Sequence, residues 1–238
     1  MELFFEVMDW FRDPAQWVGA TSVQARVVEH LQITSIAVLA ALLVALPAGL
    51  IIGHTKRGEF IVTSVANAGR AVPSFAILAL MLPITIRAGL GLGFWPTVIA
   101  LFVLAIPPIL TNAHVGVKEV DTDVVEAARG MGFSNVRILT RIELPLAVPV
   151  LLAGVRTAVV QAIATATLAA LGAWGGLGRY IIDGFAIGDM TQITAGAILV
   201  AALAIVAEIF FGGVQRILAP KTRSHPSRAP RGLTPAPN

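Results

Sequence analysis

The stretch that decides the fold is ITSIAVLAALLVALPAGLIIG, residues 33–53, which contains no charged side chain. A helix of about 20 apolar residues is long enough to cross the hydrocarbon core of a bilayer. The whole 238-residue chain is 56% hydrophobic and 13% charged, whereas soluble domains average about 25% charged residues. The sequence therefore predicts an all-α integral membrane protein in which 33–53 is the first span.

Four further apolar blocks follow the first one. They lie at 60–86, 94–117, 144–173 and 192–217. Arg70 and Pro73 interrupt the second block, and two prolines lie inside the third. Spans tolerate proline where neighbouring helices and side chains satisfy the freed backbone groups. We expect about five transmembrane helices, in a membrane domain that covers residues 25–218.

Lysine and arginine gather on alternate loops. One set of loops and the C-terminal segment carry Lys56, Arg57, Lys118, Arg129, Arg137, Arg141, Arg216, Lys221, Arg223, Arg228 and Arg231. The opposite set carries Arg12, Arg26, Arg87 and Arg179. Because loops rich in basic residues stay in the cytoplasm, the prediction is an N-terminus outside and a C-terminus in the cytoplasm.

The two ends of the chain are expected to lie outside the spans. In residues 1–24, Leu3, Val7, Trp10 and Phe11 share one helical face and acidic side chains share the other. This pattern predicts an amphipathic helix on the outer membrane surface, and the lack of an initial basic segment argues against a cleavable signal. Residues 219–238, rich in proline and basic residues, are expected to be a disordered cytoplasmic tail.

The sequence lacks the common motifs for nucleotide binding, metal binding and catalysis. It contains no G-x-x-x-x-G-K-[ST] phosphate-binding loop, no H-E-x-x-H motif and no cysteine. His30, His54, His114 and His225 are scattered along the chain. We therefore expect no catalytic residue, no metal site and no bound cofactor, and conclude that the chain is not an enzyme in its own right.

The loop at 118–145 is polar and helix-prone, and it contains EAARGMGFSNVRILTRIELP at 126–145. Asp121 or Thr122 can cap a first short helix, which Gly130 and Gly132 would end. Ser134 or Asn135 can cap a second one. The sequence predicts a helix–glycine–helix element that projects from the membrane, although an amphipathic loop resting on the inner leaflet explains the same residues.

This loop also carries a family pattern. The residues that match every fixed position of that pattern are Glu126, Ala127, Ala128, Gly132, Ile142, Leu144 and Pro145. The pattern resembles the EAA loop of permease subunits of binding-protein-dependent ABC importers. NAGRAVPSFAILALMLP at 67–83 and the segments within 141–178 are similar to the glycine betaine/carnitine/choline (osmoprotectant) subgroup. This chain departs from the subgroup at 170–178, where it has ALGAWGGLG and the subgroup has ALIGAGGLG. Trp174 adds bulk to this segment of the chain.

The resemblance implies the type I permease fold and a set of partners. In that family the EAA loop forms a coupling helix that docks on a separate ATPase subunit, which binds ATP and Mg. The residues implied in that contact are Glu126, Ala127, Ala128, Gly130, Gly132, Ile142, Leu144 and Pro145. Two ATPase copies, a second permease chain and an extracytoplasmic solute-binding protein would complete the transporter. Its implied cargo is a compatible solute such as glycine betaine, carnitine or choline.

The fourth span carries two stripes at helical spacing. Its small residues are Gly154, Ala158, Ala162, Ala166 and Ala170, and such ladders let helices approach closely in lipid. Thr157, Gln161 and Thr165 form a polar stripe beside them, which can serve packing or line a translocation path. A path without fixed negative charge would suit the release of a quaternary ammonium solute.

Three charges fall inside the spans, namely Arg70, Arg156 and Glu208. Because intramembrane charges are costly and usually paired, we expect an ion pair between Arg156 and Glu208. Two other functions stay open at this point: a permease for methionine or another small solute, and an autonomous secondary transporter. The latter predicts inverted repeats, which the sequence does not display. A membrane anchor without transport activity would not need the polar stripe.

Overall fold

The computed structural model describes residues 2–218, apart from the side chain of Arg70. These residues form helices and contain no strand. In chain order the elements are α1 (Glu2–Arg12), η1 (Pro14–Trp17), α2 (Val23–Thr55), α3 (Glu59–Ala71), α4 (Ser74–Arg87), α5 (Phe94–Lys118), α6 (Thr122–Gly130), α7 (Asn135–Ile138), the π-helical turn η2 (Leu139–Glu143), α8 (Leu144–Thr165), the 3-10 helix η3 (Ala166–Ala170), α9 (Gly178–Ile187) and α10 (Met190–Leu218). The predicted disordered tail, 219–238, lies outside the described residues.

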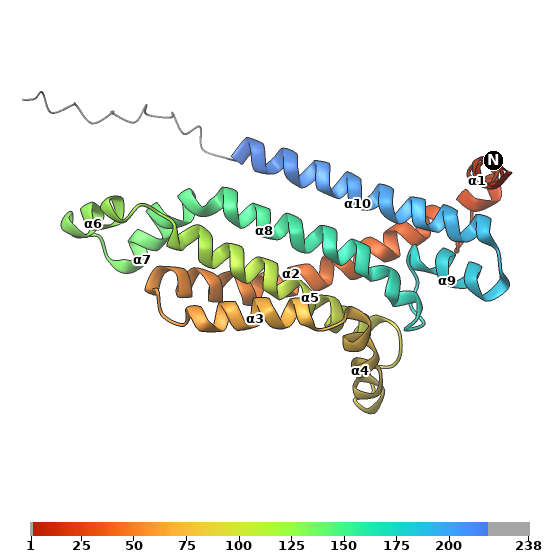
Figure 1. The fold of residues 1–238 in the computed structure, drawn as a ribbon, viewed down its shortest axis with the longest axis horizontal. Coiled ribbons are helices and arrows are strands. Elements are labelled where there is room, and N and C mark those ends of the chain that lie inside the picture. The colour runs from red at the N-terminus through yellow and green to blue at the C-terminus, as the bar shows by residue number, and fades with distance from the viewer. Residues whose placement is uncertain (1, 219–238) are drawn as a thin grey trace, which may run out of the picture.

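Four helical segments are long and apolar enough to cross a membrane. They are α2, α5, the run Asn135–Ala170 that contains α8, and α10. The pair α3 and α4 makes a fifth if it is counted as one broken span. Figure 1 shows α2, α5, α8 and α10 running along the long axis of the molecule, with α4 turned away from the bundle. The expected all-α membrane fold with about five spans is confirmed.

The block expected as one span at 60–86 is broken in the middle. Residues Glu59–Gly69 and Ser74–Arg87 form two helices that meet at an angle of 93°. Val72 between them is extended, with φ −84° and ψ 121°. The ring of Pro73 disfavours the helical conformation of the residue before it, so the helix ends at Ala71. The proline pair in α5 stays inside a continuous helix.

Glycines allow the three central helices to pack with their backbones in contact. A side chain at Gly49 of α2 would meet the Leu110 carbonyl of α5 at 2.8 Å. A side chain at Gly154 of α8 would meet the Pro108 carbonyl of α5, also at 2.8 Å. Small residues permit such close helix contacts in a membrane. The small-residue ladder on α8 and η3 is buried along its whole length, so its predicted packing role is confirmed.

The two ends of the bundle differ in structure. The short helices α6 and α7 lie at one end, and α1 and α9 lie at the other (Figure 1). At the α1 end, Val7 is buried and the ring of Trp10 packs edge-on against Tyr180 at 5.3 Å. Phe4 and Phe5 remain exposed on α1. The predicted amphipathic helix is therefore present, and it packs partly against the protein; its place at the membrane surface stays a prediction.

Candidate functional site

The polar loop folds as two short helices joined at a glycine. The Asp121 carboxylate accepts a hydrogen bond from the Asp123 N–H at 2.9 Å at the start of α6. The Ser134 hydroxyl accepts one from the Arg137 N–H at 3.4 Å at the start of α7. Both residues satisfy backbone donors that helices leave unpaired at their first turns. The projecting helix–glycine–helix element is thus built by local capping.

Gly132 makes the turn between these two helices. Its φ is +82°, a left-handed value that favours glycine. The Phe133 N–H donates to the Ala128 carbonyl at 3.1 Å, and the Gly132 N–H donates to the Arg129 carbonyl at 2.9 Å. This pair of bonds is the Schellman motif, which closes a helix with a left-handed residue just beyond its end. Gly132 therefore sets the direction in which the chain leaves α6.

The residues of the family pattern divide into exposed and buried ones. Glu126, Ala127 and Gly132 are exposed, whereas Ala128 is buried. The apolar side chains of this helix and its C-cap are also divided, because Val125 is half-buried and Met131 is 70% exposed. Of the remaining residues, Gly130 is the last residue of α6 and is exposed, and Ile142 in η2 is half-buried. Leu144 and Pro145 begin α8, where Leu144 is half-buried and Pro145 is exposed. The loop presents a small, partly apolar surface away from the membrane helices.

A buried polar pair, which the sequence analysis missed, joins this loop to the first span. His54 Nδ1 lies 2.6 Å from Glu143 Oε2. The two side chains are 11% and 6% exposed. Glu143 is the last residue of η2, directly before α8 begins. The contact links residues 89 positions apart, so only the folded packing of α2 against η2 reveals it.

Part of the predicted polar stripe lines a pocket. This polar pocket has a volume of about 300 Å³ and lies between α3, α5 and α8. Its polar lining residues are Thr111, Asn112, Thr157 and Gln161. Thr165, the third member of the predicted stripe, does not belong to its lining. Leu104 also lines the pocket, and its carbonyl lacks the usual helical donor because Pro108 has no N–H.

The intramembrane charges on α8 and α10 pair with each other. Arg156 Nε donates to Glu208 Oε2 at 2.7 Å, and Arg156 Nη2 donates to the other carboxylate oxygen. Gln215 Nε2 donates to the Pro149 carbonyl at 3.0 Å nearby. The structure thus contains the expected ion pair. Arg70 lies in the last turn of α3, and its side chain lies outside the described residues.

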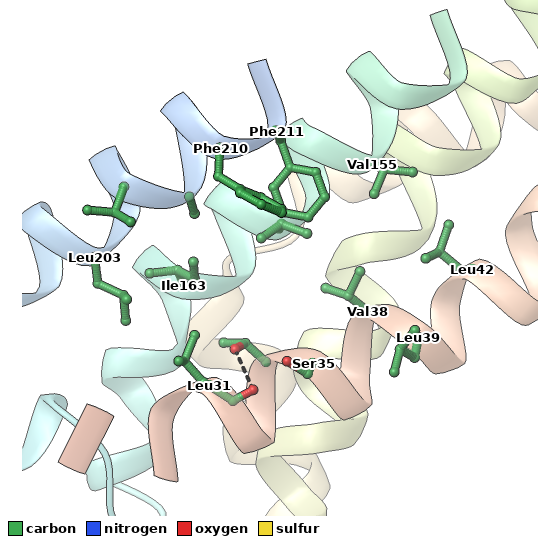
Figure 2. A pocket seen from close by; sticks show the side chains of 14 residues that line it. Leu31, Ser35, Val38, Leu39, Leu42, Val155, Ile163, Leu203, Phe210 and Phe211 are labelled. Atoms are coloured by element: carbon green, nitrogen blue, oxygen red, sulfur yellow. Dashed lines mark hydrogen bonds between the residues drawn. The ribbon is translucent and has the colours of Figure 1, made fainter. Parts of the chain in front are cut away.

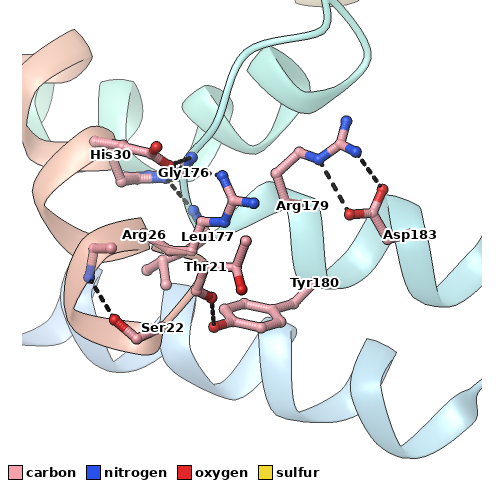
Figure 3. A network of polar contacts seen from close by, with 11 residues as sticks. Thr21, Ser22, Arg26, His30, Gly176, Leu177, Arg179, Tyr180 and Asp183 are labelled. Atoms are coloured by element: carbon pink, nitrogen blue, oxygen red, sulfur yellow. Dashed lines mark hydrogen bonds and ion pairs between the residues drawn. The ribbon is translucent and has the colours of Figure 1, made fainter. Parts of the chain in front are cut away.

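A second polar network at the α9 end fixes the segment that contains Trp174 (Figure 3). The Glu29 carboxylate accepts a hydrogen bond from the Gly176 N–H at 2.8 Å. His30 is fully buried; its Nε2 lies 2.9 Å from the Ile163 carbonyl, and its Nδ1 accepts from the Leu177 N–H at 3.3 Å. These two side chains of α2 hold the turn before α9 in place. The sequence did not predict this role, because their partners lie far along the chain.

Tyr180 extends this network toward the chain's N-terminal segment. Burial raises the pKa of the Tyr180 phenol, so the phenol stays protonated and keeps its hydrogen to donate. It donates that hydrogen to the Thr21 carbonyl at 2.9 Å (Figure 3). The turn before α9 and the start of α2 are therefore held together at this end of the bundle.

Known proteins share both this sequence and this fold. Residues 45–224 match the family model described as "Binding-protein-dependent transport system inner membrane component". The chain is 38% identical over 193 residues to the carnitine transport permease protein OpuCB of Listeria monocytogenes, a match that covers 81% of this chain and 86% of the relative. It is 37% identical to the choline transport system permease protein OpuBB of Bacillus subtilis (strain 168), again over 81% and 86% of the two chains.

A solved structure supports the fold independently of the close relatives. A chain from the inward-facing MetNI methionine ABC transporter superposes with a TM-score of 0.73 at 23% identity, and the match covers 87% of this chain and 98% of the other. At that identity the likeness concerns the fold alone. The family match and the permease relatives also identify the kind of protein. This chain belongs to the inner membrane components of binding-protein-dependent transport systems, as a multi-pass permease subunit of an ABC importer.

Proposed function

We propose that this permease imports a compatible solute with a quaternary ammonium group, such as glycine betaine, carnitine or choline. The single observation that carries the substrate class is the 36–38% identity to permeases named for carnitine, choline and glycine betaine transport. ATP hydrolysis takes place on two copies of a separate ATPase subunit. A second permease chain completes the membrane passage, and an extracytoplasmic binding protein delivers the solute.

The exposed end of α6 and the turn at Gly132 form the ATPase-docking surface in this proposal. Two apolar side chains, Met131 and Val136, are 70% and 72% exposed there. Exposed apolar groups at the tip of a projecting element are typical of contact surfaces. Ala127 adds no bulk that would keep a partner away, and the Glu126 carboxylate is available for a basic group of the ATPase. ATP binding then moves this element between two positions.

The polar pocket forms part of the solute passage in this proposal. The polar groups of Thr111, Asn112, Thr157 and Gln161 are hydroxyls and amides, and none of the lining residues whose side chains the structure describes is charged. Hydroxyl and amide groups can contact both a carboxylate and the methyl groups of a quaternary ammonium ion, and they hold neither tightly. A neutral lining therefore favours the release of the solute after the passage opens.

The proposed orientation places α6 and α7 in the cytoplasm. Because the chain has no native cysteine, single cysteines at two exposed residues test it directly. We expect Val136→Cys, between α6 and η2, to react with a membrane-impermeant maleimide only from the cytoplasmic side. We expect Leu92→Cys, between α4 and α5, to react only from outside. The reverse labelling pattern would invert the topology and remove α6 from reach of any cytoplasmic ATPase.

The transport activity is tested in proteoliposomes that contain this chain, its ATPase and its binding protein. We expect uptake of radiolabelled glycine betaine, carnitine or choline that requires ATP on the ATPase side and is absent from vesicles without the permease. Labelled methionine serves as the comparison solute. Uptake of methionine alone would keep the ABC importer assignment and overturn the proposed substrate class.

A further inference from the structure

An apolar groove lies between α2, α8 and α10, separate from the polar pocket (Figure 2). Its volume is about 540 Å³. On α2 it extends from Leu31 to Leu42, and on α10 from Leu203 to Phe211. Because a helix rises 1.5 Å per residue, the groove runs about 16 Å along α2. It therefore lies within the membrane-crossing part of three spans.

The lining of this groove leaves water almost no partner. All its lining residues are apolar except Thr34 and Ser35. The Thr34 hydroxyl already donates to backbone carbonyls of its own helix, 2.8 Å from the His30 oxygen and 3.1 Å from the Leu31 oxygen. A buried water needs two to four polar partners. The groove is thus a site for hydrocarbon.

The groove opens away from the proposed passage. Val155, Val159 and Ile163 line it from α8, whereas Thr157 and Gln161 of the same helix line the polar pocket. Residues two positions apart on a helix point about 200° from each other around its axis. The two cavities therefore lie on opposite faces of α8, and the groove faces the side where α10 is the outermost helix.

Fixed contacts on both sides of the groove keep α10 at its distance from α2. Near Phe211, the Arg156–Glu208 ion pair ties α10 to α8. Toward the other end of α10, Gly196 packs against α9, where an added side chain would meet the Tyr180 Cβ at 2.7 Å. Because α10 is held by α8 and α9 in these two places, it is not free to close onto α2. An empty groove would leave its walls without dispersion contacts.

We propose that this groove binds one acyl chain of a membrane phospholipid. Lipid tails are as apolar as leucine side chains, and an extended chain matches a slot that is long, narrow and continuous with the bilayer. A helix of a second protein chain is the competing occupant of this groove, and the disulfide test below distinguishes it from a lipid chain.

Photo-crosslinking with a phosphatidylglycerol that carries a diazirine in its acyl chain tests this site in the full-length permease in vesicles. We expect crosslinked lipid on peptides from the facing walls of α2, α8 and α10. Ala207→Phe fills the groove from α10 and should reduce this crosslinking about tenfold, the effect of losing about 1.4 kcal/mol of binding. Ala202→Phe, at an exposed position of the same helix that does not line the groove, should leave it unchanged.

A second filling variant and a cysteine variant keep the test decisive. Val159→Phe fills the groove from α8, so it replaces Ala207→Phe if that variant does not fold, as judged by gel filtration. Crosslinking that is equal in the filled and unfilled proteins, or spread evenly over exposed residues such as Leu43 and Ile209, would overturn the proposal. A disulfide between two copies of Val159→Cys would also overturn it, because the groove would then be a contact between chains.

Discussion

Replacing Gly132 with valine is expected to abolish solute uptake while the permease stays in the membrane at its normal level. Gly132 has a φ of +82°, a conformation that costs residues with a side chain about 1–2 kcal/mol and β-branched residues most. No atom lies within 4 Å of a Cβ built at this position, so the effect is one of backbone conformation. The turn would change and misplace Glu126, Ala127 and Ala128.

The loss is measured as ATPase co-purification and as uptake in vesicles. Since 1.4 kcal/mol is a factor of ten in binding, we expect ATPase retention to fall about tenfold. Gly213→Val is the matched control, because Gly213 also has free space around it but lies inside α10, away from the docking surface. Gly132→Asn should restore part of the activity, since asparagine tolerates the left-handed conformation. Normal uptake by the valine variant would return the loop to the role of a plain linker.

The second large effect is expected at His54 and Glu143. His54→Leu removes the hydrogen-bond donor that faces Glu143 at 2.6 Å and leaves a carboxyl group that is 6% exposed without its partner. Such a loss costs about 3 kcal/mol or more when the stranded group is charged. We expect a clear fall in the thermal unfolding midpoint of the purified permease, and a matching loss of uptake because η2 is no longer fixed to α2.

A double-mutant cycle distinguishes the interaction between His54 and Glu143 from a general loss of stability. The variant that carries both His54→Leu and Glu143→Leu leaves no unpaired polar group, so we expect it to be more stable than His54→Leu alone. Glu59→Gln is the control, because Glu59 pairs with Lys118 at the surface, where ion pairs contribute little. If the double variant is as unstable as the worse single one, the two side chains do not stabilise each other.

Much of the membrane architecture is predictable from the sequence because apolar length is a strong local signal. The first span was predicted at 33–53 and found within α2, Val23–Thr55, where the helix continues past the apolar stretch to a cap at Ser22. The sequence did not indicate which prolines break a helix. Pro73 ends α3, whereas Pro107 and Pro108 lie inside α5, which continues as a helix although these two residues have no N–H to donate.

The residues of the candidate sites also differ in whether their partners are near or far along the chain. Capping at Asp121 and Ser134 and the turn at Gly132 depend on neighbouring residues and could be predicted. Glu29, His30, His54 and Glu143 act through partners far along the chain. In a single sequence each is only an isolated polar residue near the end of a helix, so its function appears only when the helices are packed.

The close contacts of Gly49 and Gly154 have a mechanical consequence. Backbones packed this closely resist sliding past one another, so we expect α2, α5 and α8 to move as one rigid body. α5 has 25 residues and is therefore about 37 Å long. Over that length, a tilt of about 5° displaces one end of the helix by about 3 Å relative to the other. In the proposed transporter, a movement of α6 would therefore be transmitted to the opposite membrane face, and the passage would open between the two permease chains.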